Sequence, residues 1–142
     1  MGNMRACGSL ITVLLLACGC ARFAPAPDTL AGSSWQLVKF QGGDGATRVP
    51  DDKSKYTLAF GVDGTFNVRF DCNRGRGGWK SPGPKQVRFG AMAMTRAACP
   101  PGSMHDQLVK HWSYVRAYVI EGGNLRLSLM ADGGIYEFEP AR

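Results

Sequence analysis

Two short groups of polar residues have the types that enzymes use for catalysis. Ser103, His105 and Asp106 supply a nucleophile, a base and an acid, and Glu137 and Glu139 share one strand face. The first three lie too close together in the chain to assume a triad, and they suit the capped, solvated start of a helix. An acid–base pair needs its carboxyl groups in different environments, whereas both glutamates lie near the C-terminus. We therefore expect a protein that is not an enzyme.

Residue types that hold metals or phosphates are also poorly placed. His105 and His111 lie six positions apart, so they point to different faces of a helix. Neither Cys72 nor Cys99 has another Cys or a His at the spacing of a metal site. The segment 75–78 is rich in glycine but lacks the Lys-Ser/Thr ending of a phosphate-binding loop. We expect neither a metal nor a cofactor.

Basic residues form the densest cluster that a ligand could contact. Seven lysines and arginines fall within 28 positions, with only Asp71 opposing them, and Trp79 lies among them. Such a patch attracts anionic partners such as lipid headgroups, a cell-wall polymer or an acidic protein surface. A solvated sheet face and loop without a dedicated ligand is the alternative interpretation. The seven residues are Arg69, Arg74, Arg76, Lys80, Lys85, Arg88 and Arg96.

The composition fits one globular domain. The chain has 142 residues, of which 44% are hydrophobic and 20% charged, and its formal net charge is +6. That length is too short for two domains and excludes a large multi-domain enzyme. Nineteen glycines and eight prolines are too many for a helical bundle, and they follow no collagen-like period.

The N-terminus has the pattern of an export signal. Arg5 precedes an apolar run at 10–17, which is shorter than the roughly 20 residues of a membrane-spanning helix but fits a signal-peptide core of about 7–15. The segment Leu15-Leu16-Ala17-Cys18 resembles the lipobox of bacterial lipoproteins, in which the Cys after the cut is acylated. Cys20 is the alternative acylation site. An ordinary secreted protein cut near 24–26 is the other interpretation.

These patterns divide the chain and predict where it works. Residues 1–17 form a lipoprotein signal peptide, 18–30 a lipid-anchored flexible tether, and 31–142 the folded domain. Neither candidate Cys is followed by Asp, which favours the outer membrane, facing the periplasm, over retention in the inner membrane. The basic patch would suit nucleic acid electrostatically. We do not expect nucleic acid as a partner, because an exported lipoprotein rarely meets it.

The remaining residues predict short antiparallel strands and one helix. Met104, Leu108, Trp112 and Val115 lie on one helical face. Asp63-Gly64 is a hairpin turn. We expect a loop at 72–85 because that segment is rich in Gly and Pro. The fold class is therefore mainly β (α+β): a small, highly curved antiparallel sheet or barrel with one packed helix. Apolar alternation predicts strands at 34–40, 56–60, 66–70, 87–89, 117–121, 125–129 and 135–139.

Two motifs resemble the META/HslJ domain family. Phe70-Asp71-Cys72-Asn73 is similar to the family's Gly-Cys-Asn turn, and Met94-Thr95-Arg96-Ala97-Ala98-Cys99-Pro100 to its Thr-Arg-Met-Ala-Cys-Pro segment. The resemblance covers about 30–140 and implies an exported, often lipid-anchored, barrel-like domain. Family members are associated with stress tolerance and with motility, virulence or secretion, and no catalytic residues transfer. Further pieces in family order are Trp35-Gln36-Leu37, 56–60 with Asp63-Gly64, and Leu125-Arg126-Leu127 with Asp132-Gly133.

The resemblance also draws attention to the two cysteines in its motifs. Cys72 and Cys99 belong to a domain that we expect in an oxidising compartment, so we predict a disulfide between them. Two buried free thiols are the alternative. Asp71 departs from the family pattern, in which Gly usually precedes the Cys. Cys20 is left over, either acylated in place of Cys18 or a reactive thiol on the tether.

Three functions fit these observations. The first is a non-catalytic, lipid-anchored envelope protein of META/HslJ type that acts in envelope stress tolerance by binding an envelope component. The second is a pilotin-like secretion accessory lipoprotein that binds an outer-membrane secretin peptide, for which an apolar groove between helix and sheet is expected. The third is a carrier of a small apolar ligand, which needs a cavity larger than about 300 Å³.

Overall fold

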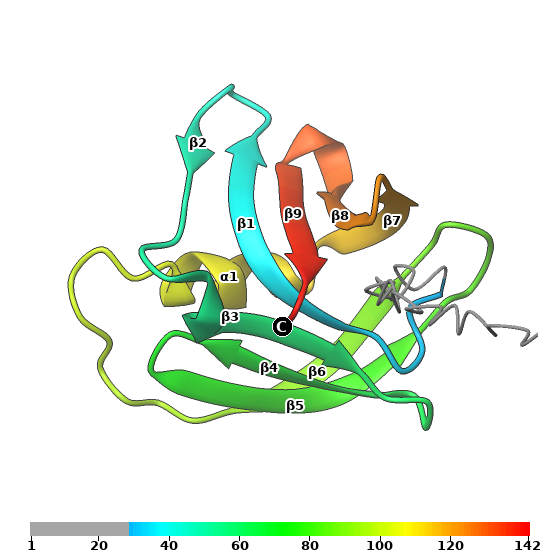
Figure 1. Cartoon of the computed structure of the whole chain (residues 1–142), viewed down its shortest axis with the longest axis horizontal. Helices are drawn as coiled ribbons and strands as arrows, with labels where there is room; N and C mark the ends of the chain where they lie inside the picture. The colour runs from blue at the N-terminus through cyan, green and yellow to red at the C-terminus, as the bar shows by residue number, and fades with distance from the viewer. Residues whose placement is uncertain (1–28) are drawn as a thin grey trace, which may run out of the picture.

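A computed structural model describes residues 29–142 (Figure 1). The predicted signal peptide and both candidate acylation sites, Cys18 and Cys20, lie outside the described residues. Leu30, which we placed at the end of the tether, is buried in the core. Within the part that the structure describes, no helix has the length and apolar character needed to cross a membrane.

The described residues form one curled antiparallel sheet, which confirms the predicted mainly β fold. Eight strands follow the order β6-β5-β4-β3-β1-β9-β8-β7, and the short strand β2 pairs with β1. Two 3-10 turns, η1 (Lys53–Lys55) and η2 (Met130–Asp132), and one helix, α1 (His105–Trp112), complete the elements. The strands are β1 (Ser34–Gly42), β2 (Thr47–Arg48), β3 (Tyr56–Phe60), β4 (Thr65–Phe70), β5 (Asn73–Lys80), β6 (Arg88–Met94), β7 (Val115–Glu121), β8 (Asn124–Leu129) and β9 (Gly134–Pro140).

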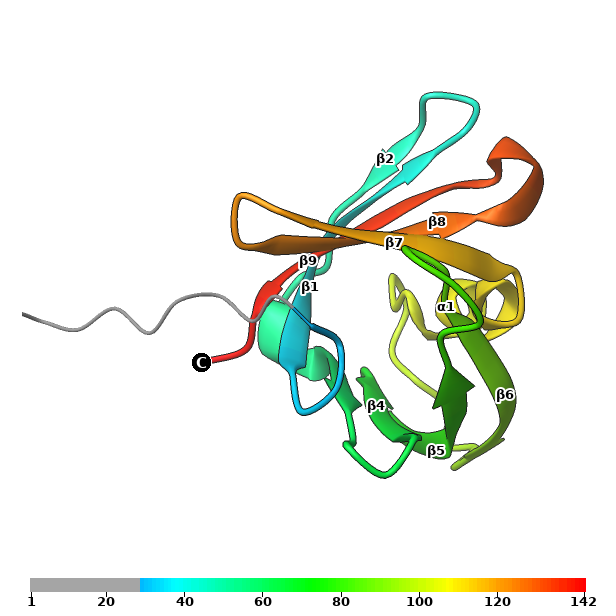
Figure 2. The same ribbon diagram turned by 90° about the vertical axis from the view of Figure 1, so that its right-hand side faces the viewer.

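The two edges of this sheet meet at one end only. The N–H of Val87 donates to the carbonyl of Arg116 (3.2 Å), and the N–H of Tyr118 donates to the carbonyl of Lys85 (2.9 Å). Figure 2 shows the loop between β5 and β6 reaching β7 at this point. The sheet is therefore a half-barrel. Its two edges, at β6 and β7, are joined by a short seam of hydrogen bonds rather than by a full ladder.

The concave side of the sheet and α1 enclose the hydrophobic core. The helical face predicted from the sequence is confirmed, since Met104, Leu108, Trp112 and Val115 are all buried. The helix is shorter than this face, because Met104 lies at its N-cap and Val115 begins β7. Trp112 stacks on Phe89 with their ring centroids 4.4 Å apart. Large side chains, mostly aromatic, fill the interior; the fully buried ones include Trp35, Tyr56, Phe60, Phe66, Phe70, Tyr136 and Phe138.

The predicted loop at 72–85 is wrong, because most of this segment is strand β5. Its residues alternate between exposed Arg74 and Arg76 and the inward positions Gly75 and Gly77. A Cβ on Gly75 would lie 2.7 Å from Met94 Cε, and one on Gly77 would lie 2.8 Å from a Phe66 ring carbon. The glycines are required because the neighbouring side chains occupy the space in front of them. Glycine is common in loops, but in this strand it is needed because neighbouring side chains leave no room for a Cβ.

The packing of α1 makes a direct prediction. Leu108→Ala should lower the free energy of unfolding by about 2–5 kcal/mol, because the lost methyl groups leave a cavity against the sheet. Val109→Ala is the matched control: its side chain is 37% exposed, so we expect a change within about 0.5 kcal/mol. Urea unfolding measures both. Equal effects of the two substitutions would contradict the packing of this helix face.

Candidate functional site

The buried amide of Asn73 joins the start of β5 to the segment that follows β6. Its Oδ1 accepts hydrogen bonds from the N–H of Ala97 (2.7 Å) and from Thr95 Oγ1 (2.9 Å), and its Nδ2 donates to the carbonyl of Ala97 (2.9 Å). The side chain thus pairs with Ala97 as a neighbouring strand would. The backbone of Arg74 continues this pairing, because its N–H donates to Thr95 Oγ1 (2.9 Å) and its carbonyl accepts from the N–H of Thr95.

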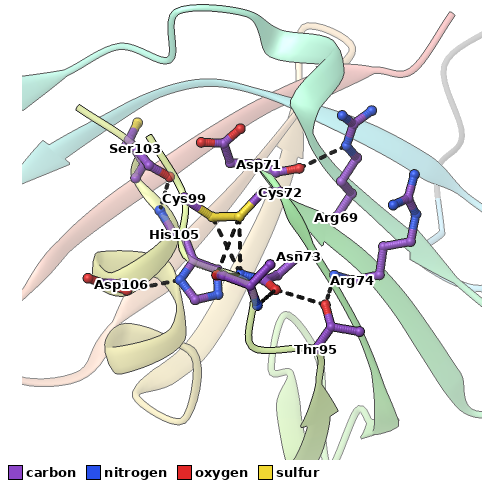
Figure 3. Close-up of a disulfide and its surroundings, with 12 residues drawn as sticks. Arg69, Asp71, Cys72, Asn73, Arg74, Thr95, Cys99, Ser103, His105 and Asp106 are labelled. Carbon is purple, nitrogen blue, oxygen red and sulfur yellow. Dashed lines mark hydrogen bonds and ion pairs between the residues drawn. A yellow bond between two sulfur atoms is a disulfide. The ribbon is translucent and has the colours of Figure 1, made fainter. Parts of the chain in front are cut away.

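A disulfide lies directly beside this amide, as predicted. Cys72 and Cys99 are bonded, with their Cα atoms 5.5 Å apart, and Asn73 Nδ2 lies 3.4 Å from each sulfur. Figure 3 shows the amide under the disulfide, with Arg69 and Arg74 on one side and His105 and Asp106 on the other. The sequence separation is 27 residues. Closing a loop of this size stabilises the fold by roughly 3–4 kcal/mol in the chain-entropy model. We call Cys72, Asn73, Thr95, Ala97 and Cys99 the clasp.

The departure at Asp71 has a backbone explanation. Asp71 has φ of 58°, in the left-handed region that favours glycine and that Asp tolerates better than most residues. Its N–H donates to the carbonyl of Lys55 (2.8 Å), and its carbonyl accepts from Arg69 Nε (3.0 Å). The turn before Cys72 is therefore kept in place although the usual Gly is missing.

The residues considered for catalysis do not form a catalytic arrangement. Ser103 Oγ accepts a hydrogen bond from the backbone N–H of His105 (3.2 Å), which supports the first turn of α1. His105 Nδ1 lies 2.9 Å from Asp106 Oδ1, so no contact links the serine hydroxyl to the imidazole. The glutamates have structural partners: Glu137 pairs with Lys39 and Arg126, and Glu139 with Lys53.

A second polar cluster, which the sequence does not reveal, lies between α1 and the sheet. The hydroxyl oxygen of Tyr136 accepts a hydrogen bond from Gln107 Nε2 (3.1 Å) and lies 2.9 Å from His111 Nδ1. Arg48 Nη1 donates to Gln107 Oε1 (2.6 Å). Burial raises the pKa of Tyr136. Burial also lowers the pKa of His111, and the positive charge of Lys110 lowers it further. These hydrogen bonds tie α1 to Tyr136 of β9 and to Arg48 of β2.

The surface beside this cluster bears on the pilotin-like alternative. A groove of about 420 Å³ separates α1 from β1 and β2. Phe40 is its one large apolar side chain, and charged or polar residues such as Arg48, Asp106 and Lys110 line the rest. The character of this groove is therefore mixed rather than apolar.

Three of the seven predicted basic residues lie together on the outer face of β4 and β5, which we call the arginine face: Arg69, Arg74 and Arg76. Arg69 is directly opposite Arg74 in the strand pairing, and Arg76 is opposite Asn67. None of the three forms an ion pair with a described residue. A shallow groove of about 370 Å³ runs past Arg74 and Arg76 to Thr95.

The other predicted basic residues lie elsewhere. Arg96 is exposed and sits within the clasp segment, between Thr95 and Ala97. Lys80 is opposite Arg88 in the strand register, near the other end of β5. At roughly 3.3 Å per residue, Lys80 lies about 20 Å along the strand from Arg74. Lys85 and Arg88 belong to the seam with β7. The structure therefore divides the basic stretch into two surfaces.

The described residues contain no group of three or more His, Cys, Asp or Glu side chains that could hold a metal ion. The clasp is built from neutral side chains and a closed disulfide. Beside it, Arg69, Arg74 and Arg96 form no ion pair with a described residue.

The fold is a half-barrel of antiparallel strands with one packed helix, and the clasp joins the start of β5 to the segment that follows β6. The META domain model matches residues 28–142, so the chain belongs to the META domain family. It is similar in structure to a protein from Burkholderia xenovorans (20% identity, TM-score 0.67, covering 90% of this chain and 99% of that one). A DUF4847 family protein from Bacteroides vulgatus is also similar (17% identity, TM-score 0.57, covering 78% and 93%). No curated protein matches the chain.

The clasp makes the next prediction. Asn73→Ala should lower the free energy of unfolding by about 1–3 kcal/mol, because it removes both partners of the Ala97 backbone. Asn67→Ala, on the exposed face of β4, is the matched control and should change little. Urea unfolding under non-reducing conditions measures both, so that the disulfide stays closed. A loss at Asn73 no larger than that at Asn67 would contradict the role of the amide.

The lowered pKa of His111 predicts a pH dependence. The unfolded chain takes up a proton near the ordinary pKa of about 6.5, whereas the folded chain resists it. Stability should therefore fall as the pH drops below about 6.5. His111→Gln should flatten this part of the curve, which thermal unfolding between neutral and mildly acidic pH can follow. An unchanged slope in the variant would be inconsistent with a neutral, partly buried His111.

Proposed function

We propose that this META domain protein is a non-catalytic, lipid-anchored envelope protein that acts in envelope stress tolerance by binding an anionic envelope component. The arginine face is its contact surface. The N-terminal pattern up to Cys18 supports the anchor at the outer membrane. The Cys72–Cys99 disulfide is typical of proteins that work in an oxidising compartment such as the periplasm.

The direct opposition of Arg69 and Arg74 is the observation that carries this proposal. Like charges facing each other across two strands destabilise a sheet. Surface charges of one sign are usually interspersed with the other sign, yet no described carboxylate pairs with these arginines. An anion bound at this face would offset the repulsion. The guanidinium groups are suited to phosphate and carboxylate, which they hold with two parallel hydrogen bonds.

The arrangement of β5 gives the same face its shape. Gly75 and Gly77 point inward, so their strand packs closely on the core while the two arginines point outward. Arg69 Nε is bonded to the carbonyl of Asp71, which limits the motion of that side chain. The clasp holds the neighbouring segment 95–97 at the edge of the face. A positively charged surface on the outside of the sheet suits an extended anionic surface.

Charge reversal tests the arginine face. We use the full chain with Cys18→Ser and Cys20→Ser, so that acylation at these positions does not contribute to binding. It should cosediment with vesicles that contain phosphatidylglycerol or with isolated cell-wall polymer, and raised salt should weaken the binding. Arg74→Glu with Arg76→Glu should reduce binding at least about tenfold, since each basic residue near an anionic surface contributes about 1 kcal/mol.

The matched control keeps the net charge equal. Lys110→Glu with Arg142→Glu makes the same change in charge on α1 and at the C-terminus, where both residues are exposed. It should bind like the parent chain. Equal losses in the two double variants would show attraction by net charge alone, and no binding to either material would contradict the proposal. Saturable binding of a secretin peptide alone would favour the pilotin-like alternative.

A further inference from the structure

Strand β6 has a free edge. It stands at one end of the strand order and pairs with β5 alone, and Figure 2 shows it as the last strand on its side of the half-barrel. The other end of the sheet differs, because the seam covers part of β7, and β7 carries the charged residues Arg116 and Glu121. We call the side of β6 that faces away from β5, over residues 92–94, the open edge.

The hydrogen bonds of β6 show which backbone groups point to this edge. The N–H of Thr95 donates to the carbonyl of Arg74 on β5 (3.0 Å). Backbone groups alternate in direction along an antiparallel strand, so those of Ala93 also point to β5, whereas those of Met92 and Met94 point away from it. Within residues 29–142, the backbone of Met92 and Met94 forms no hydrogen bond with any element other than β5. These groups are therefore free to pair with one more strand.

The usual protection of a sheet edge is missing here. Proteins commonly block such edges with charged residues, prolines, bulges or a covering segment. From Gly90 to Met94, no residue is charged and none is proline, and Gly90, Ala91 and Ala93 are exposed. The register shift in the pairing with β5 lies before Met92, so residues 92–94 pair regularly. An extended chain can therefore add to this edge by main-chain pairing.

The side chains of β5 and β6 give an added strand two different faces. Ala93 lies directly opposite Arg76 and shares its outer face. Strands lie about 4.8 Å apart, so an added strand would be about 10 Å from the backbone of Arg76, and Arg and Glu side chains together can span this distance over the small Ala93. On the inner face, Met92 and Met94 are half-buried against the core. The added strand would thus meet positive charge outside and apolar side chains inside.

Charge distinguishes between the possible occupants of the open edge. The stretch from Cys72 to Met104, which contains β5 and β6, carries no acidic residue. Two copies of the chain paired edge to edge would bring two such basic stretches together, and like charges repel. An extended segment that carries carboxylates would meet opposite charge instead. The basic residues of the stretch are Arg74, Arg76, Lys80, Lys85, Arg88 and Arg96.

We propose that the open edge binds an extended acidic segment of another protein, in which acidic and apolar residues alternate. The segment adds as an antiparallel strand and forms main-chain hydrogen bonds with Met92 and Met94. Its carboxylates lie on the outer face, toward Arg76, and its apolar side chains lie beside the two methionines. This partner goes beyond the anionic envelope component proposed above.

Methylated peptides test the main-chain pairing. The full chain with Cys18→Ser and Cys20→Ser is titrated calorimetrically at neutral pH with acetyl-Val-Glu-Val-Glu-Val-Glu-Val-amide. We expect saturable binding with a dissociation constant below about 1 mM. In an added antiparallel strand, only the valine N–H groups point to β6. N-methylation of the last three valines should therefore weaken binding at least about tenfold, whereas N-methylation of the three glutamates should change it less than about twofold.

Hydrogen exchange and two variants locate the peptide. NMR should show slower exchange of the Met92 and Met94 amides in the complex and no change for Ala93, whose amide already points to β5. Ala93→Glu places a carboxylate beside the peptide and should weaken binding several-fold. Gln41→Glu adds the same charge at an exposed position of β1 and should bind like the parent chain. Circular dichroism checks that both variants are folded.

A lysine peptide tests the charge of the partner. Acetyl-Val-Lys-Val-Lys-Val-Lys-Val-amide should bind at least about tenfold more weakly than the glutamate peptide. The proposal is overturned by equal binding of the lysine peptide, by no binding of the glutamate peptide, or by a dimer of the chain that protects the same amides without peptide. It is also overturned by equal affinities of the two methylated peptides. Both carry the same charge, so attraction by the arginine face alone would bind them equally, whatever the vesicle experiment shows.

Discussion

The side-chain amide of Asn73 is the interaction on which the arrangement of this half-barrel depends. After β6, the chain must leave the sheet and cross to α1, and the segment 95–99 has no regular strand partner for most of its length. Asn73 supplies that partner by pairing with Ala97, and the Cys72–Cys99 disulfide fixes the same two segments covalently. The direction in which the chain enters α1, and hence the packing of Leu108 and Trp112 in the core, follows from this clasp.

The second constraint is the close packing of β5. Its inward positions are glycines because Met94, Val68 and Phe66 already occupy the interior in front of them. Between Arg74 and Gly77 the inward positions of β5 carry no side chains, and Arg74 and Arg76 point outward. The same strand changes character after Gly77, where the register shifts and Trp79 turns toward Phe60. One strand thus presents a basic outer face at its start and a tryptophan that packs against the core at its end.

Local patterns predict the parts of this fold that depend on local physics. Alternation at 56–60 and 66–70, the Asp63-Gly64 turn and the single apolar face of α1 all appear in the structure, because burial of one face dictates the residue types. Strand β5 escapes this pattern, since a segment of Gly, Arg and Pro has no apolar alternation to detect. Its Gly and Arg do alternate at 74–77, and that is the signal which could have identified it. The seam between 85–88 and β7 depends on pairing between residues about thirty positions apart, which no local pattern reports.

In the candidate site, too, local patterns predict some features, while others depend on how distant segments pair. The motif around Cys72 and Cys99 predicted the disulfide, whereas the role of Asn73 depends on where Ala97 lies in space. Proximity in sequence groups seven basic residues, but the length of β5 separates Arg74 and Arg76 from Lys80 and Arg88. The clasp therefore has a structural role, and we propose the arginine face as the surface that meets the envelope. Residue-resolved NMR of the full chain, titrated with soluble short-chain phosphatidylglycerol, separates these roles most directly. We expect shifts in the amides of Arg69, Arg74 and Arg76 and none in the loop 97–106; shifts centred on that loop, or spread evenly over the molecule, would contradict binding at the arginine face.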